Sequence, residues 1–141
     1  MKTIKQYFQS GLILSLFFLS SCTTEDPAPS PTDPRASYIG TWGVSETWHK
    51  LSYEVSISYD QGSSTGVYID NFANAGPGVK AHATVSGSSI AITDLPQNLS
   101  NGWVIESGSG SLQGTTKINW NYVFNDGANQ YSAVATYSKK K

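Results

Sequence analysis

Cysteine and histidine are scarce in this sequence of 141 residues, which holds one cysteine and two histidines. One cysteine excludes an internal disulfide framework and a metal site built from several thiolates. Two distant histidines with scattered acids are a poor start for a zinc site, and no Asp-x-Asp-x-Asp-Gly loop for calcium is present. We therefore expect neither a metal nor a cofactor.

Charge is also sparse, because charged residues make up 13% of the sequence and the formal net charge is -1. A charged fraction this low excludes a highly charged disordered chain and a long coiled coil. The near-zero net charge gives no reason to expect nucleic acid as a partner. Between residues 37 and 138, seven acids outnumber three lysines, and three lysines follow at 139–141. The sequence therefore predicts an acidic domain with a basic end.

The residues that common hydrolases need are few. A lone histidine on a strand, such as His82, is more often a surface or hydrogen-bonded residue than a base, and no Gly-x-Ser-x-Gly motif is present. Four acids could supply the carboxylate pair of a glycosidase, but their spacing does not pair them, and acids on strands are usually solvated. These acids are Glu46, Glu54, Asp70 and Glu106. We expect that the protein is not an enzyme.

The first residues have the pattern of an export signal. Two lysines precede an apolar run at 11–19, which is too short to span a bilayer. The Leu-Ser-Ser-Cys motif that ends at Cys22 resembles the lipobox of bacterial lipoproteins, in which the cysteine thiol receives a diacylglycerol and the preceding peptide bond is cut. This resemblance implies a lipoprotein signal peptide over 1–21 and lipidation of Cys22. A secretory signal with an incidental cysteine is the alternative.

A proline-rich segment follows the lipobox. Residues 23–36 hold four of the six prolines and almost no apolar bulk. This composition predicts that the lipidated Cys22 begins an extended, solvated tether over 22–36. Glu25 and Asp26 resemble the acidic signals that direct some Gram-negative lipoproteins to the outer leaflet. We expect a protein anchored by lipid in the outer membrane, facing the cell surface, with its folded domain over 37–141.

From residue 38 to 138 the sequence alternates with period two and shows no helical period. In the segment 117–125, four large apolar residues alternate with asparagines, which is the pattern of a half-buried strand. Seven further segments show the same alternation. The eight expected strands are 39–48, 52–59, 66–72, 79–85, 89–93, 103–112, 117–125 and 130–137. Short glycine-rich turns between them predict an all-β fold, a single eight-stranded antiparallel up-and-down barrel, with a β-sandwich as the alternative.

The first expected strand carries a resemblance to a known superfamily. Gly40-Thr41-Trp42 resembles the Gly-x-Trp opening of the calycins, which include lipocalins and avidins. The resemblance implies that Trp42 plugs one end of the barrel and that Gly40 lets the backbone pass close to the last strand. The late arginine that stacks on this tryptophan in lipocalins has no match, because the only arginine is Arg35 in the predicted tether. The biotin-binding residues of avidins are not reproduced. The pattern is also similar to small lipoproteins with calycin-like barrels.

Aromatic residues make up 12% of the sequence and have two explanations. They fill a barrel core, or Trp48, Trp103 and Trp120 line a mouth or groove for a sugar or apolar ligand. The asparagines of 117–125 either bond such a ligand or face solvent. We expect a non-catalytic barrel that binds a small ligand or glycan. The alternative is a structural or protein-binding lipoprotein, such as an inhibitor or accessory subunit, with a packed core. Nothing in the sequence indicates an oligomeric state.

Overall fold

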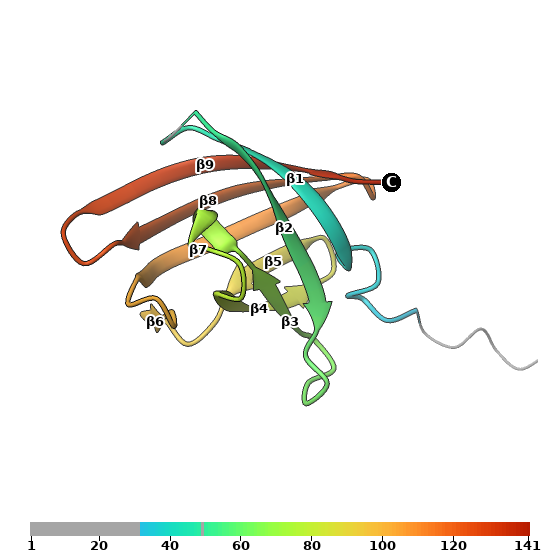
Figure 1. Ribbon diagram of the computed structural model, residues 1–141. Helices are drawn as coiled ribbons and strands as arrows, with labels where there is room; N and C mark the ends of the chain where they lie inside the picture. Colours follow the sequence, from blue (N-terminus) through green and yellow to red (C-terminus); the bar gives the residue numbers. More distant parts are fainter. Residues whose placement is uncertain (1–31, 49) are drawn as a thin grey trace, which may run out of the picture. The chain divides into compact units, whose positions relative to one another are not determined.

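The computed structural model describes residues 32–48 and 50–141, which contain nine β-strands and one short 3-10 helix, η1 (Phe72–Asn74). The strands are β1 (Gly40–Glu46), β2 (Ser52–Tyr59), β3 (Gly66–Asp70), β4 (Lys80–Ser86), β5 (Ser89–Ile92), β6 (Gln97–Asn98), β7 (Val104–Gln113), β8 (Lys117–Asn125) and β9 (Gln130–Lys139) (Figure 1). The signal peptide, Cys22 and most of the tether lie outside the described residues, so those predictions stay predictions.

Eight of these strands form a closed ring. The sheet runs in the order β5-β4-β3-β2-β1-β9-β8-β7, and β5 also pairs with β7, so no edge is left open. Every pairing is antiparallel, and β1 pairs with both β2 and β9. The predicted eight-stranded up-and-down barrel is therefore confirmed, because a sandwich would leave two separate sheets.

The ninth strand, β6, continues β5 after an interruption. Both pair antiparallel with β7, but Ala91 lies opposite Ser109 whereas Gln97 lies opposite Ile105. Two extra residues are thus accommodated between β5 and β6. Alternation predicted β5 but missed β6, because a two-residue strand has no period to detect.

The inward faces of the strands build a core rich in aromatic residues. On β8 the alternation is confirmed, since its four large apolar residues are buried and Asn119 and Asn121 face outward. The largest fully buried side chains are Trp42, Trp120, Tyr38, Tyr122, Tyr137, Phe72 and Phe124, with five isoleucines. Alanines on β4 and β9 leave room for them: Ala81, Ala83, Ala133 and Ala135.

Two glycines of β7 make room for large side chains. Gly108 and Gly110 lie where the β7–β8 register is regular, from Ser107 to Gln113. A Cβ added at Gly110 would lie 2.9 Å from the Trp120 ring, and one at Gly108 would lie 2.6 Å from the Ile92 side chain. The absent side chains are therefore what lets large residues from neighbouring strands fill the interior.

Buried aromatic residues lie at both ends of the barrel. The N-terminal turn and the C-terminus lie at one end, where the Lys139 Nζ donates a hydrogen bond to the Ser37 carbonyl at 2.9 Å (Figure 1). Trp42 is fully buried there. At the other end η1 inserts Phe72, which is fully buried, against Trp120 and Tyr122, with ring centroids 5.5 and 4.8 Å away.

Candidate functional site

Two of the three predicted ligand-binding tryptophans come together at the end opposite Trp42. Trp48 follows β1 and Trp103 precedes β7, and their ring centroids are 6.5 Å apart. Trp48 also contacts Phe124 and Tyr131, at 4.8 and 4.5 Å, and Trp103 stacks on Phe124 at 5.1 Å. These rings pack mainly on one another, so this aromatic cluster forms a hydrophobic cover over that end of the barrel.

Trp120 does not join that cluster. It is 0% exposed and packs against Phe72 and Tyr137 in the middle of the barrel. The three tryptophans therefore do not line one mouth. Alternation on β8 already placed Trp120 on the inward face, but alternation cannot tell a cavity wall from a filled core.

The Gly-x-Trp segment lies at one end of the barrel, beside the last strand. Trp42 is buried, donates a hydrogen bond from Nε1 to the Tyr38 carbonyl at 2.8 Å, and lies opposite Lys139 of β9. The Lys139 Nζ lies 5.2 Å from the Trp42 ring centroid. The Lys139 ammonium thus lies over the face of this tryptophan. Gly40 has a φ of 128°, a conformation that favours glycine.

A carboxylate lies inside the barrel, which the sequence did not predict. Glu46 is 4% exposed, and its Oε2 accepts hydrogen bonds from the hydroxyls of Tyr53, at 2.8 Å, and Tyr122. Burial raises the pKa of Tyr53, Tyr122 and Tyr137 well above the ordinary tyrosine value, so all three hydroxyls stay protonated. The signal for Glu46 was present, because it continues the inward alternation of Trp42 and Val44.

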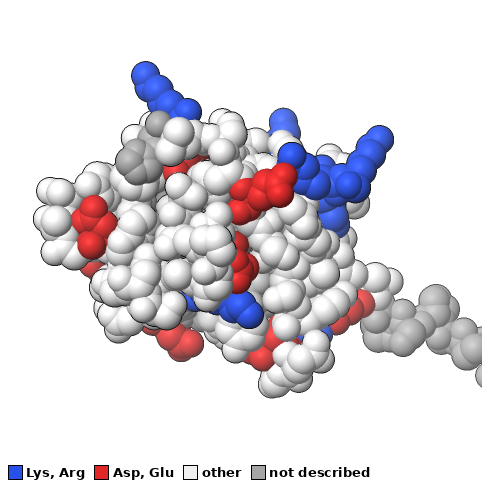
Figure 2. Space-filling model, in the orientation of Figure 1, with Lys and Arg blue, Asp and Glu red and all other residues white. Residues whose placement is uncertain are grey.

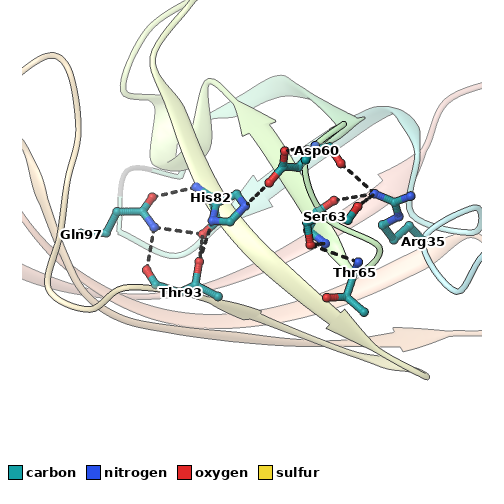
Figure 3. Close-up of polar contacts among 9 residues, drawn as sticks. Arg35, Asp60, Ser63, Thr65, His82, Thr93 and Gln97 are labelled. Atoms are coloured by element: carbon teal, nitrogen blue, oxygen red, sulfur yellow. Dashed lines mark hydrogen bonds and ion pairs between the residues drawn. The ribbon is translucent and has the colours of Figure 1, made fainter.

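A polar network on the outer surface surrounds His82 (Figure 3). The His82 Nε2 lies 3.0 Å from the Asp60 Oδ2, and the Nδ1 lies 2.8 Å from the Thr93 Oγ1. The backbone N–H of Gly62, followed by His82 and Arg35, holds the pKa of Asp60 below its usual value. His82 is thus the hydrogen-bonded surface histidine that its sequence context favoured.

Gly66 and Gln97 fix this network in place. A Cβ at Gly66 would lie 3.0 Å from both the Asp60 Oδ2 and the His82 Nε2, so only glycine lets these groups meet. The Gln97 amide accepts a hydrogen bond from the His82 backbone N–H at 2.7 Å and donates to the Thr93 carbonyl at 2.7 Å. The network joins the β2–β3 loop, β4 and the β5–β6 connection.

Arg35 anchors the start of the domain to the same loop. Its Nη1 donates to the carbonyls of Asp60, Ser63 and Gly66 at 3.0, 2.6 and 3.1 Å, and its guanidinium lies 4.6 Å from the Tyr59 ring centroid. Hydrogen bonding to the Asp33 carboxylate raises the pKa of Arg35. The expectation that Arg35 belongs to a solvated tether is therefore wrong, because its side chain packs on the barrel.

The outer face of β7, β8 and β9, called here the amide–hydroxyl face, is made of small uncharged side chains. Its rows, read across the three strands, are Ser111-Asn119-Thr136, Ser109-Asn121-Val134 and Ser107-Val123-Ser132. A shallow depression of about 470 Å³ lies over its centre, with Leu95 at its edge. Val134 is 52% exposed and Leu95 is 45% exposed. Apolar and hydrogen-bonding groups are thus interleaved on one open surface.

Charges lie elsewhere on the molecule. Lysines gather near the end that carries the C-terminus, and large areas of the view in Figure 2 hold no charged side chain. The Lys140 ammonium pairs there with the Glu54 carboxylate at 3.0 Å. In the rows of the amide–hydroxyl face, no side chain is charged.

Within residues 32–48 and 50–141, no three His, Cys, Asp or Glu side chains gather in a way that could hold a metal ion. The same part of the chain holds no helix that is long and apolar enough to cross a membrane.

Comparison with known proteins finds similar structures but no match by sequence. No protein-family model matches the chain, and a search of curated proteins finds no match. A redesigned beta barrel is similar to it, with a TM-score of 0.52 and 11% identity over 77% of this chain and 96% of that one. A second similar structure carries the name putative outer membrane protein, from Bacteroides fragilis. Its TM-score with this chain is 0.47, with 18% identity over 77% of this chain and 53% of that one. The redesigned barrel shows the fold that this chain shares.

Proposed function

We propose that the protein is a non-catalytic binding module whose ligand is a neutral, hydroxyl-rich molecule such as a glycan. The ligand lies on the amide–hydroxyl face rather than inside the barrel. The observation that carries this proposal is Asn121. Its side chain lines the depression, in the row with Ser109 and Val134, and makes no hydrogen bond within the described part of the chain.

The asparagines of β8 are hard to explain structurally. Asparagine is disfavoured inside strands, and Asn119 and Asn121 lie in the middle of one. Other asparagines have local structural roles: the amide of Asn71 bonds the Glu54 carbonyl, and that of Asn125 accepts from the Gly127 N–H. Since Asn119 and Asn121 have no such role, their amides are free to donate to and accept from a ligand.

The chemistry of the face favours a neutral partner. An uncharged array of amides and hydroxyls attracts neither anions nor cations, but it matches the paired donors and acceptors of sugar hydroxyls. The exposed Val134 and Leu95, with the half-buried Val123, offer apolar contact for the C–H face of a sugar ring. The filled interior supports an outer site, because Phe72 and Trp42 are buried at the two ends of the barrel.

A protein partner is the second candidate, and one observation favours it. Few large apolar side chains are exposed on the described part of this domain, yet two of them, Leu95 and Val134, share one depression on one face. A packed core with one apolar patch is what a structural or protein-binding barrel would have. A glycan array separates the two candidates, because a face that serves a protein partner alone binds no glycan.

The proposed absence of catalysis rests on the surroundings of His82. Asp60, His82 and Thr93 have the carboxylate–imidazole–hydroxyl order that could move a proton. However, none of the depressions described on this surface is lined by His82 or Thr93. The network instead ties three segments of the barrel together, which is a structural role.

The location of the protein is proposed from its sequence. The lipobox resemblance and the proline-rich segment support a calycin-like lipoprotein held at the outer membrane by a lipid on Cys22. Cells fed a labelled fatty acid should incorporate the label into the unaltered protein but not into Cys22→Ser, because that substitution removes the thiol that would carry the lipid. Equal labelling of the two proteins, or no labelling of the unaltered one, contradicts the lipid anchor.

The binding proposal is tested with the full-length protein in detergent on an array of neutral and charged glycans, followed by calorimetric titration of the best ligand. Asn121→Ala should weaken binding about 2- to 10-fold, since one hydrogen bond contributes roughly 0.5–1.5 kcal/mol. Gln61→Ala, which removes an exposed amide from the β2–β3 loop, should bind like the unaltered protein. Equal affinity of Asn121→Ala, or no glycan binding at all, contradicts the proposal.

A further inference from the structure

Three polar atoms inside the barrel have no hydrogen-bond partner among the described residues. They are Oε1 of Glu46, Nε1 of Trp120 and the hydroxyl of Tyr137. The three side chains are 4%, 0% and 0% exposed, so bulk water does not reach them. A buried polar group without a partner is destabilising, and native proteins satisfy nearly all such groups with protein atoms or enclosed water.

The three side chains surround one small residue. Ala135 of β9 lies between Glu46 of β1 and Trp120 of β8 in the register of the sheet. Tyr137 is the next inward-facing residue of β9, and its ring centroid is 5.8 Å from that of Trp120. Neighbouring strands hold their side chains about 5 Å apart. Only the methyl group of Ala135 therefore occupies the sheet between the Glu46 carboxylate and the indole.

The missing partner must both accept and donate hydrogen bonds. The Trp120 N–H can only donate, and the Glu46 Oε1 needs a donor. A metal cation cannot accept from the indole, and an anion offers no donor to the carboxylate. The other Glu46 oxygen already accepts from Tyr53 and Tyr122. A neutral donor–acceptor molecule alone fits all three atoms.

Size restricts this molecule further. Phe72 is fully buried against Trp120 and Tyr122 on one side, and Trp42 is fully buried at the far end. Water is the smallest molecule that accepts two hydrogen bonds and donates two, and buried water usually makes two to four. We propose that the barrel encloses an ordered water over Ala135, bound by Glu46, Trp120 and Tyr137.

The sign of a stability change tests this site. In the full-length protein, Tyr137→Phe should lower the melting temperature by about 4 °C or more, because a hydrogen bond to the enclosed water is lost. If the Tyr137 hydroxyl has no partner, its removal should instead raise the melting temperature, since an unsatisfied group disappears. An unchanged or raised melting temperature overturns the proposal.

A direct readout complements the melting experiment. Oxygen-17 relaxation dispersion should detect a long-lived internal water in the unaltered protein, and Ala135→Val, which fills the space, should abolish its signal. Ala83→Val on β4 is the matched control, since it adds the same atoms at another fully buried alanine and should keep the signal. The absence of a long-lived water in the unaltered protein overturns the proposal even if Ala135→Val does not fold.

Discussion

At the scale of single residues, a glycine of β7 contributes to packing because it has no side chain. Gly110 faces the Trp120 ring and the Ile90 side chain, which an added Cβ would approach to 2.9 and 3.0 Å. Both neighbours are fully buried and belong to strands, so neither can move freely. Gly110→Ala should lower the free energy of unfolding by about 1–3 kcal/mol, as overpacking of a core does, measured by urea denaturation.

The control for this substitution is Gly62→Ala in the β2–β3 loop. A Cβ there would lie 3.4 Å from the Asp60 carboxylate, an ordinary contact, and the backbone is not in the left-handed region. Its free energy of unfolding should stay close to that of the unaltered protein. A Gly110→Ala protein as stable as this control would show that Trp120 has room to move.

The residues that the sequence did not reveal are those whose role depends on distant partners. Glu46 was predicted to be solvated, although its inward position follows from Trp42 and Val44, because a charged residue at a core position needs partners that local sequence does not show. Arg35 was assigned to the tether, because its three carbonyl partners come from the β2–β3 loop. Neither contact leaves a periodic trace along the chain.

At the scale of elements, η1 acts as a plug for one end of the barrel. Phe72 packs on Trp120 and Tyr122, and the preceding Asn71 has a φ of 63°, which turns the chain inward after β3. Phe72→Ala should lower the free energy of unfolding by about 3–5 kcal/mol, the usual cost of emptying a buried aromatic site. Urea denaturation measures this change. Leu51→Ala, which shortens a half-exposed side chain outside the barrel, should cost far less.

The same substitution should also open the barrel. A hydrophobic dye should bind Phe72→Ala at urea concentrations where the unaltered protein does not bind it, because the interior loses its cover. If the free energy of unfolding of Phe72→Ala equals that of Leu51→Ala, η1 is not a plug.

Strands with a long alternating segment were predictable, and short elements were not. Strands β2 and β8 lie at their predicted bounds, since eight or nine alternating residues leave one assignment. Residues 71 and 72 were predicted to continue β3, whereas the chain leaves the sheet after Asp70. A three-residue helix and the two-residue β6 are set by tertiary contacts rather than by pattern. The candidate face was only half predictable, because the outward asparagines were evident but the closed interior was not.

At the scale of the whole molecule, the barrel separates its aromatic and its hydrogen-bonding residues. Most of the aromatic rings are directed inward or to the end that carries Trp48, where they contact one another. A continuous set of amides and hydroxyls lies outside on β7, β8 and β9. This separation is why the proposed ligand site moves from the tryptophans to the outer face, and it leaves the barrel as a rigid support for that face.

The closed interior also determines how the molecule should respond to alkali. Burial raises the pKa of Tyr53, Tyr122 and Tyr137 in the folded state, whereas these hydroxyls ionise near their ordinary value of about 10 once the chain unfolds. A group with a raised folded pKa stabilises fully below the unfolded pKa and loses its contribution as pH rises above it. The free energy of unfolding should therefore be steady up to about pH 10 and fall beyond it.

This alkaline transition has a specific signature. Ionisation of the buried tyrosines, followed by tyrosinate absorbance, should coincide with unfolding, followed by tryptophan fluorescence, because the folded barrel does not admit the charged form. Tyr53→Phe should make the decline with pH shallower, since one fewer hydroxyl ionises only on unfolding. Tyrosinate absorbance that reaches its full amplitude while the tryptophans keep their folded fluorescence would mean that the barrel interior is open to solvent.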